Sequence, residues 1–210
     1  YTGEDTLSLH DALPICADLP VAPRLCLHPP DEIRAVRAVE EHGLDGPVER
    51  WRALRQQARD EIDGRGVANG HFTQYYGTDE VDAALLLLPQ VGYCAPDDPR
   101  MLATVRRIED TLMHDGLVLR YRTDTGVDGL PGAEHPFLAC SFWLVEQYAA
   151  TGRVDDAEAL MDRACAAAND LGLLAEEYDV EGRRQAGNMP QAFSHLALVR
   201  AADALAAARF

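Results

Sequence analysis

From residue 31 onward, hydrophobic residues recur every three or four positions, and no stretch alternates apolar and polar residues as a half-buried strand would. This spacing is typical of helices and predicts an all-α protein. The expected helices span residues 31–42, 47–63, 78–93, 98–113, 135–151, 154–171 and 190–208.

The predicted helices are of two kinds that alternate along the chain. Residues 47–63, 98–113 and 154–171 carry Arg, Asp and Glu along one face, so these helices should lie on the outside. The helices that contain residues 83–88, 137–144 and 192–199 are apolar on nearly every face and should be buried all round. Alternating outer and inner helices predict part of an α/α toroid.

The lengths of the connections agree with this alternation. Connections from inner to outer helices are short, at residues 94–97 and 152–153. Connections from outer to inner helices are long, at residues 64–77, 114–134 and 172–189. The alternation places the long loops at one end of the toroid, where we expect the functional site.

Composition excludes several classes of partner. The chain of 210 residues has a formal net charge of −16, which would repel nucleic acid and anionic membranes but not a neutral sugar. The longest apolar run, residues 83–89, is too short to cross a bilayer. The five cysteines include no Cys-x-x-Cys pair, so we expect reduced thiols, with no metal site and no cofactor.

The N-terminal segment does not look like part of a fold. Residues 6–15 are similar to one translated reading frame of a common short-read sequencing adapter, so we interpret residues 1–15 as an artefact. Residues 16–33 are rich in proline and have no period, which indicates an irregular or frame-shifted join. Residues 34–210 are the expected domain, and its natural N-terminus is expected to lie elsewhere.

The long-loop end gathers aromatic, acidic and arginine side chains, a mixture that suits a carbohydrate pocket. The candidates are His71, Tyr75, Tyr76, Asp79, Arg120, Tyr121, Arg122, Asp128, Glu134, Glu176, Glu177, Tyr178, Asp179, Arg183 and Arg184. Local sequence alone favours a solvated acidic loop for Glu176 and Glu177, and it leaves the role of Arg120 open. His195 is expected to be an ordinary core histidine, and no nucleophile elbow accompanies it.

Several ordered blocks resemble glycoside hydrolase family 15, in particular its bacterial glucoamylase-like and trehalase-like members. The blocks are residues 76–83 (YGTDEVDA), 115–121 (DGLVLRY), 137–144 (FLACSFWL), 169–179 (NDLGLLAEEYD) and 187–195 (GNMPQAFSH). The resemblance covers about residues 34–205. It implies an (α/α)6 toroid, of which this chain is the C-terminal half.

The resemblance also implies an inverting glycosidase, in which a base carboxylate activates water and an acid carboxylate protonates the leaving oxygen. The family's base maps onto Glu176, and its substrate-binding Arg-Tyr pair maps onto Arg120 and Tyr121. The expected substrate-binding set is completed by Glu177, Tyr178 and Glu134. The family's acid follows a tryptophan in an earlier loop, and residues 34–210 contain no such Trp-Glu segment.

The leading hypothesis is an enzyme that hydrolyses α-glucosidic bonds of α-glucan oligosaccharides, of which this chain carries the base but not the acid and is inactive alone. The alternatives are an α,α-trehalase of the same family and a non-catalytic helical-hairpin scaffold that binds a protein or a glycan. The expected partner is an α-glucoside or oligosaccharide, and the expected location is cytoplasmic. Residues 134–136 depart from the Glu-Gly followed by a small residue that bacterial relatives tend to carry.

Overall fold

The computed structural model describes residues 35–125 and 134–209. The expected artefact at residues 1–15 and the expected join at residues 16–33 lie outside the described residues. The chain forms two compact units. Unit 1 comprises Tyr1–Gly66 and Tyr75–Gly77, and unit 2 comprises Val67–Gln74 and Thr78–Phe210.

The described residues of unit 1 include two helices, as the hydrophobic spacing predicts. Residues 35–42 are helical, and α2 spans Val48–Arg65. Glu49 in the first turn of α2 and Arg65 in the last turn both have the sign of charge that the helix dipole favours. The Arg65 guanidinium also lies over the Tyr76 ring, 4.5 Å from its centroid.

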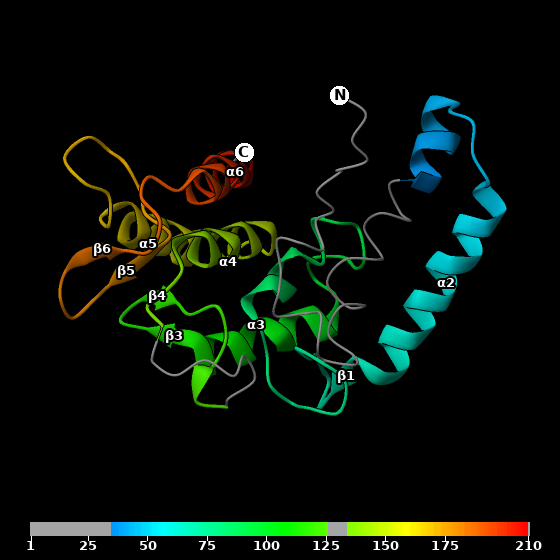
Figure 1. Cartoon of the computed structure of the whole chain (residues 1–210), viewed down its shortest axis with the longest axis horizontal. Coiled ribbons are helices and arrows are strands. Elements are labelled where there is room, and N and C mark those ends of the chain that lie inside the picture. The colour runs from blue at the N-terminus through cyan, green and yellow to red at the C-terminus, as the bar shows by residue number, and fades with distance from the viewer. Residues whose placement is uncertain (1–34, 126–133, 210) are drawn as a thin grey trace, which may run out of the picture. The chain divides into compact units, whose positions relative to one another are not determined.

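Unit 2 is built around four helices (Figure 1). The helix α3 spans Pro99–Leu112, α4 spans Leu138–Ala150, α5 spans Val154–Cys165 and α6 spans Ala192–Ala208. The start of α3 is fixed by Asp98, whose carboxylate accepts a hydrogen bond from the Arg100 amide at 2.8 Å, and by proline in the first turn.

Burial distinguishes the predicted outer helices α3 and α5 from the predicted inner helix α4. The helix α3 buries Met101, Val105, Ile108 and Leu112 on one face, and α5 likewise buries only one face. In contrast, α4 is buried on nearly every side, and it packs beside α5 and α6 (Figure 1). The described helices therefore form part of an α/α toroid, with α4 at the centre of the core.

The predicted helix at residues 78–93 is wrong in extent. Only Ala83–Leu87 form a helix, and it is of the 3-10 type. The residues before it are held extended, because Asp82 forms a β-bridge with Tyr121 and the Ala83 amide donates to the Arg120 carbonyl at 2.8 Å. Proline at position 89 has no amide hydrogen to continue a helix. The other predicted helices are present, although α5 ends at Cys165 and not at residue 171.

The long connections contain three short antiparallel hairpins that the sequence period did not predict. They pair β1 (Val67–Ala68) with β2 (His71–Phe72), β3 (Met113–His114) with β4 (Leu117–Val118), and β5 (Glu177–Asp179) with β6 (Arg184–Ala186). The first two turn at Asn69-Gly70 and Asp115-Gly116, all at positive φ. Asn-Gly and Asp-Gly are strong hairpin signals, so these turns were detectable in the sequence.

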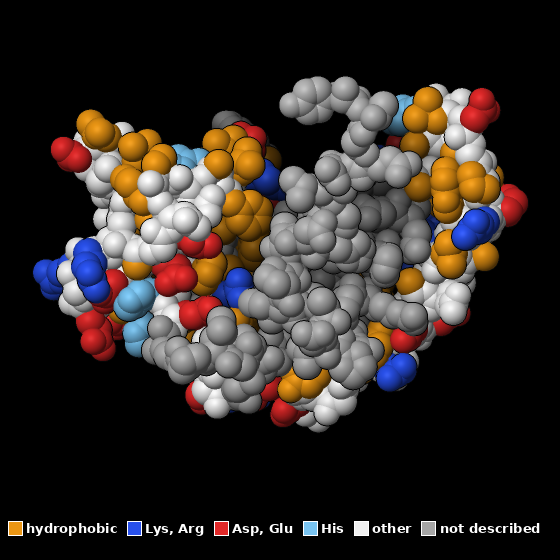
Figure 2. All heavy atoms as spheres, viewed as in Figure 1, with side chains coloured by type: hydrophobic (Ala, Val, Ile, Leu, Met, Phe, Trp, Pro, Cys, Tyr) orange, Lys and Arg blue, Asp and Glu red, His pale blue; other side chains and the backbone are white. Residues whose placement is uncertain are grey.

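The expectation that residues 192–199 are buried all round is also wrong for the described structure. On α6, Ser194, Ala197, Ala201 and Leu205 are buried. The same helix leaves Phe193, Leu196 and Val199 exposed by 52%, 63% and 58%. Hydrophobic side chains are visible on the surface around α6 (Figure 2). Within the described part of the chain, the apolar sequence of α6 is therefore buried on only one side.

Candidate active site

Backbone hydrogen bonds join the long connections at one end of unit 2. The Phe137 amide donates to the Val118 carbonyl at 2.9 Å, and Phe137 forms a β-bridge with Glu177. The Tyr178 amide donates to the Pro136 carbonyl at 3.0 Å. The loop after α5 is thus fixed against the start of α4, as the alternation of short and long connections predicts.

Glu176 lies in this fixed segment, immediately before β5. Its amide donates to the Asn188 carbonyl at 2.9 Å, and its carbonyl accepts from the Leu138 amide at 3.0 Å. Its carboxylate Oε2 accepts from the Asn188 amide at 3.1 Å and from Asn188 Nδ2 at 2.9 Å. Both bonds go to one oxygen, which orients the carboxylate and leaves Oε1 to interact with another group.

Gly187 makes the close approach to Glu176 possible. A Cβ at position 187 would lie 2.9 Å from Glu176 Oε2 and 3.0 Å from Glu176 Cβ, and the residue has a φ of +71°. Both the space and the backbone conformation favour glycine. Neither Gly187 nor Asn188 was singled out from the sequence, although a Gly-Asn pair before an inner helix is visible there.

Arg120 and Tyr121 follow strand β4 in the chain, and their side chains are in contact. The Arg120 guanidinium lies 4.6 Å from the centroid of the Tyr121 ring and 5.2 Å from that of Phe137. It also donates to the Tyr121 hydroxyl at 2.7 Å. Stacking on two rings holds the planar guanidinium in one orientation, which suits it to bind hydroxyl or carboxylate oxygens.

Several carboxylates at this end of unit 2 lie close enough together to influence one another's pKa. Burial raises the pKa of Glu177, and the charges of Glu134 and Glu176 raise it further, while the His135 amide, which donates to Glu177 Oε2 at 3.3 Å, lowers it. The charge of Glu134 also acts on Arg120. The structure therefore brings Glu176, Glu177, Glu134, Arg120 and Tyr121 together. The Tyr178 backbone is bonded to Pro136, next to Phe137, whose ring lies against Arg120.

Asp179 closes the β5–β6 hairpin beside this cluster. The Gly182 amide and the Arg184 guanidinium both donate to its carboxylate, at 2.8 and 3.0 Å, and they lower its pKa. His135 Nδ1 lies 3.9 Å from the same carboxylate. Arg184 thus stabilises the hairpin, whereas the sequence placed it only among the loop-end residues.

A cavity of about 450 Å³ lies at the same end, between the C-terminal end of α3, the segment after β4 and the β5–β6 hairpin. Acidic side chains gather on this face around β4 and β5 (Figure 2). Tyr121, Arg122, Glu134 and Asp179 are the sequence candidates in its lining, which does not include Glu176. Among the residues that the structure describes, no group of His, Cys, Asp and Glu side chains is placed to hold a metal ion.

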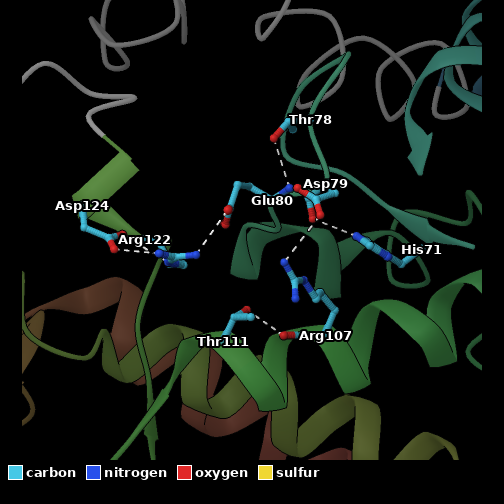
Figure 3. A network of polar contacts seen from close by, with 8 residues as sticks. All are labelled: His71, Thr78, Asp79, Glu80, Arg107, Thr111, Arg122 and Asp124. Carbon is cyan, nitrogen blue, oxygen red and sulfur yellow. Dashed lines mark hydrogen bonds and ion pairs between the residues drawn. The ribbon is translucent and has the colours of Figure 1, made fainter. Parts of the chain in front are cut away.

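A separate polar network fixes the segments around this cavity to α3 (Figure 3). Asp79 lies 3.8 Å from Arg107, and its carbonyl is 2.9 Å from His71 Nε2. The Glu80 carboxylate lies 3.3 Å from the Arg122 guanidinium, which also pairs with Asp124 at 2.6 Å. The network gives the sequence candidates His71, Asp79 and Arg122 structural partners.

Asp82 is an acidic group that the sequence did not reveal. Its carboxylate accepts from the Ala84 amide at 2.7 Å and caps the 3-10 helix. Burial raises its pKa to about 6, although the bond from Ala84 and the charge of Arg120 oppose this shift. The sequence does show an aspartate just before the apolar run. The burial of its carboxylate, however, depends on the β-bridge to Tyr121, which is distant in the chain.

The raised pKa predicts how stability depends on pH. Between the ordinary value of 3.8 and about 6, the folded state binds the Asp82 proton more tightly than the unfolded state does. This contribution is therefore present at low pH and is lost as the pH rises through 6, by roughly 2–3 kcal/mol. Asp82→Asn should abolish this loss, because the amide stays neutral and its oxygen can still accept from Ala84. Urea unfolding at pH 4.5 and pH 7 measures the difference.

Asp98→Asn is the matched control, because Asp98 also caps a helix. Its bond from Arg100 lowers its pKa, so its contribution is lost as the pH falls. This loss occurs below the ordinary value of 3.8, so Asp98→Asn should leave the difference between pH 4.5 and pH 7 nearly unchanged, whereas Asp82→Asn should abolish it. Parallel curves for the wild type and Asp82→Asn between pH 4.5 and 7 would contradict the burial of this charge.

Among the described residues, no helix combines the length and apolar character that a membrane crossing requires.

Cys94, Cys140 and Cys165 are free thiols, and Cys140 is buried in α4. These findings agree with the sequence prediction of unpaired cysteines at those three positions.

Comparison with known proteins identifies relatives along most of the chain. The profile of the family described as Glycosyl hydrolases family 15 matches residues 33–203. A protein named trehalase from Mycobacterium tuberculosis is 43% identical over 169 residues, which cover 80% of this chain and 25% of the relative. A trehalase from Thermoplasma acidophilum is 38% identical over 174 residues, covering 81% of this chain and 29% of the relative.

Solved structures share the fold. A structure titled as a wild-type glycosidase superposes with a TM-score of 0.71 at 21% identity, covering 83% of this chain and 49% of that one. A variant of a glycosidase in complex with glucose gives a TM-score of 0.70 over the same shares. The chain spans about a quarter of the length of the curated relatives from M. tuberculosis and T. acidophilum.

Proposed function

Because the chain belongs to glycosyl hydrolases family 15, we propose that it is the C-terminal half of the catalytic domain of an inverting glycoside hydrolase, with Glu176 as the general base. The proposed domain comprises residues 34–210. The completed enzyme cleaves α-glucosidic bonds. Its general acid lies in the other half of the domain, so the chain alone does not turn over substrate.

The orientation of the Glu176 carboxylate carries this proposal. A general base must hold one oxygen toward the water that it deprotonates, in a fixed direction. Asn188 binds Oε2 through two donors, and Gly187 lets the backbone approach it. Oε1 is then the oxygen that takes the proton from water. Arg120 and Tyr121, stacked together, bind hydroxyl groups of the cleaved sugar, while Glu134, Glu177 and Tyr178 complete its binding site.

The exposed side of α6 supports the proposal that the domain is incomplete. Phe193, Leu196 and Val199 form an apolar surface on a helix that the toroid places on the inside. Exposed apolar surface of this kind usually marks an interface. The missing half of the toroid covers it in the complete domain.

We propose α,α-trehalose as the substrate, because the relatives from M. tuberculosis and T. acidophilum are named trehalases. The sequence blocks alone favoured α-glucan oligosaccharides. Both substrates present an α-linked glucose to the base and to Arg120. They differ in the group that leaves, and that group lies beyond the residues assigned here.

A substrate panel distinguishes the two. The protein with its complete catalytic domain should hydrolyse trehalose with a kcat/KM at least about tenfold above those for maltose and isomaltose, a preference that corresponds to about 1.4 kcal/mol in transition-state binding. The measurement is release of glucose under initial-rate conditions. A preference for maltose would favour the oligosaccharide reading, and hydrolysis of none of the three would contradict the proposed reaction.

A further inference from the structure

The loop that ends at Glu176 is bonded to the first turn of α6. The Gln191 amide donates to the Leu174 carbonyl at 2.9 Å. The Leu174 amide donates to His195 Nε2 at 3.3 Å, and the Ser194 hydroxyl donates to the Ala175 carbonyl at 2.8 Å. Three backbone groups of Leu174 and Ala175 are thus bound by α6 and its N-cap residue.

These bonds fix the protonation of His195. Its Nδ1 lies 2.8 Å from the Gln191 carbonyl, which can only accept, so Nδ1 carries the hydrogen. Its Nε2 receives the Leu174 amide hydrogen, so Nε2 must present a lone pair. The imidazole is therefore neutral and of a single tautomer, and both of its nitrogens are engaged.

The bond from Leu174 to His195 is partly buried, and its donor lies on the buried side. Leu174 and Ala175 are exposed by only 1% and 0%. A buried amide that loses its acceptor is unfavourable, so the loop would move to satisfy it. Glu176 follows two residues later, and its amide and carbonyl are tied to other segments. A shift at Leu174 would therefore turn the carboxylate relative to Asn188.

We propose that His195 is a positioning residue for the general base: its Nε2 lone pair holds the Leu174 amide and thereby sets the direction of the Glu176 carboxylate. This proposal rests on the proposed function of Glu176. His195 does not touch the substrate. It acts through the backbone of the loop, and this distinguishes it from the core histidine that the sequence predicted.

Two variants of the protein with its complete catalytic domain separate positioning from packing. His195→Phe fills the space but offers no acceptor, whereas the Oε1 of His195→Gln can replace Nε2. His195→Phe should lower kcat by roughly 10- to 100-fold with little change in KM, because a small misplacement of a catalytic group is costly. His195→Gln should recover most of this loss.

Two measurements that do not depend on activity accompany the kinetics. Hydrogen exchange at the Leu174 amide should become about tenfold faster or more in His195→Phe and should stay near wild type in His195→Gln. The ¹⁵N resonances of His195 in the wild type should show a neutral ring protonated at Nδ1. A wild-type ring protonated at Nε2 would overturn the proposal even if both variants failed to fold.

His71→Phe is the matched control, since His71 also binds a backbone carbonyl, that of Asp79, through a ring nitrogen. It should lower stability without lowering kcat. An equal loss of kcat in His71→Phe and His195→Phe, or unchanged exchange at Leu174, would overturn the positioning role. A fully active Glu176→Gln would instead refute the proposed function, while exchange at Leu174 would still report on the bond to His195.

Discussion

Replacing Glu176 with glutamine should lower kcat for hydrolysis by about 10²–10⁴-fold, the range that a general base contributes. The amide has nearly the same shape, and its oxygen can still accept from Asn188, which binds Glu176 Oε2 at 2.9 Å in the wild type. It cannot take a proton from water. Because the sugar contacts remain, KM should change little. Initial rates with trehalose, measured on the complete catalytic domain, provide the test.

Glu177→Gln is the matched control, because it makes the same chemical change at the next residue. Because Glu177 belongs to the proposed sugar-binding site and is not the proposed base, the variant should raise KM and should lower kcat far less than Glu176→Gln does. The Glu177 carboxylate accepts from the His135 amide at 3.3 Å, and a glutamine oxygen can do the same. The reverse result, with Glu177→Gln inactive and Glu176→Gln active, would move the base by one position.

In unit 2 the sequence predicted a helix correctly where the hydrophobic spacing within that helix determines which of its faces is buried. The spacing of Met101, Val105, Ile108 and Leu112 indicates the buried face of α3. The uniformly apolar stretch around Phe142 indicates the central helix α4. In both cases local periodicity and burial agree, and the capping residue Asp98 marks where α3 begins.

The sequence failed where partners distant in the chain decide the conformation. The hydrophobic spacing predicts a helix that includes residues 78–82, whereas the bridge between Asp82 and Tyr121 holds this segment extended. The apolar stretch in α6 predicted complete burial, whereas Phe193 and Leu196 are exposed. Apolar residues on every face of α6 predict packing on every face, and the described residues provide it on one side only.

The candidate site shows the same division. The acidic loop could be located from the sequence, and the resemblance selected Glu176 within it. The roles of Asn188, Gly187 and His195 depend on hydrogen bonds that cross from the loop to α6 and to the turn before it. No local pattern reports such bonds, which is why His195 was expected to be only a core residue.

The stereochemistry of the product should be inverted completely. In an inverting enzyme the two carboxyl groups stand roughly 6.5–9.5 Å apart, and water attacks from the face opposite the leaving oxygen. Attack on an α-glucoside then yields β-glucose. A retaining enzyme, with carboxyl groups about 5–5.5 Å apart, forms a covalent intermediate and yields α-glucose. If Glu176 acts on water as a base, no covalent intermediate forms.

Trehalose makes this outcome easy to read, because its two glucose units have different fates. The unit attacked by water leaves as β-glucose, while the other unit leaves with its α configuration intact. The two anomers should therefore appear in equal amounts at first and drift only as mutarotation proceeds. Reaction in ¹⁸O-labelled water should place the label in the β-anomer at early times.

Proton NMR of trehalose hydrolysis in its first minutes is the most direct test of Glu176 as the base of an inverting mechanism. The complete catalytic domain should release α- and β-glucose in equal amounts, and Glu176→Gln should suppress both together. Release of α-glucose alone would contradict the mechanism, because it would make the carboxylate at this position a nucleophile or leave it without a role.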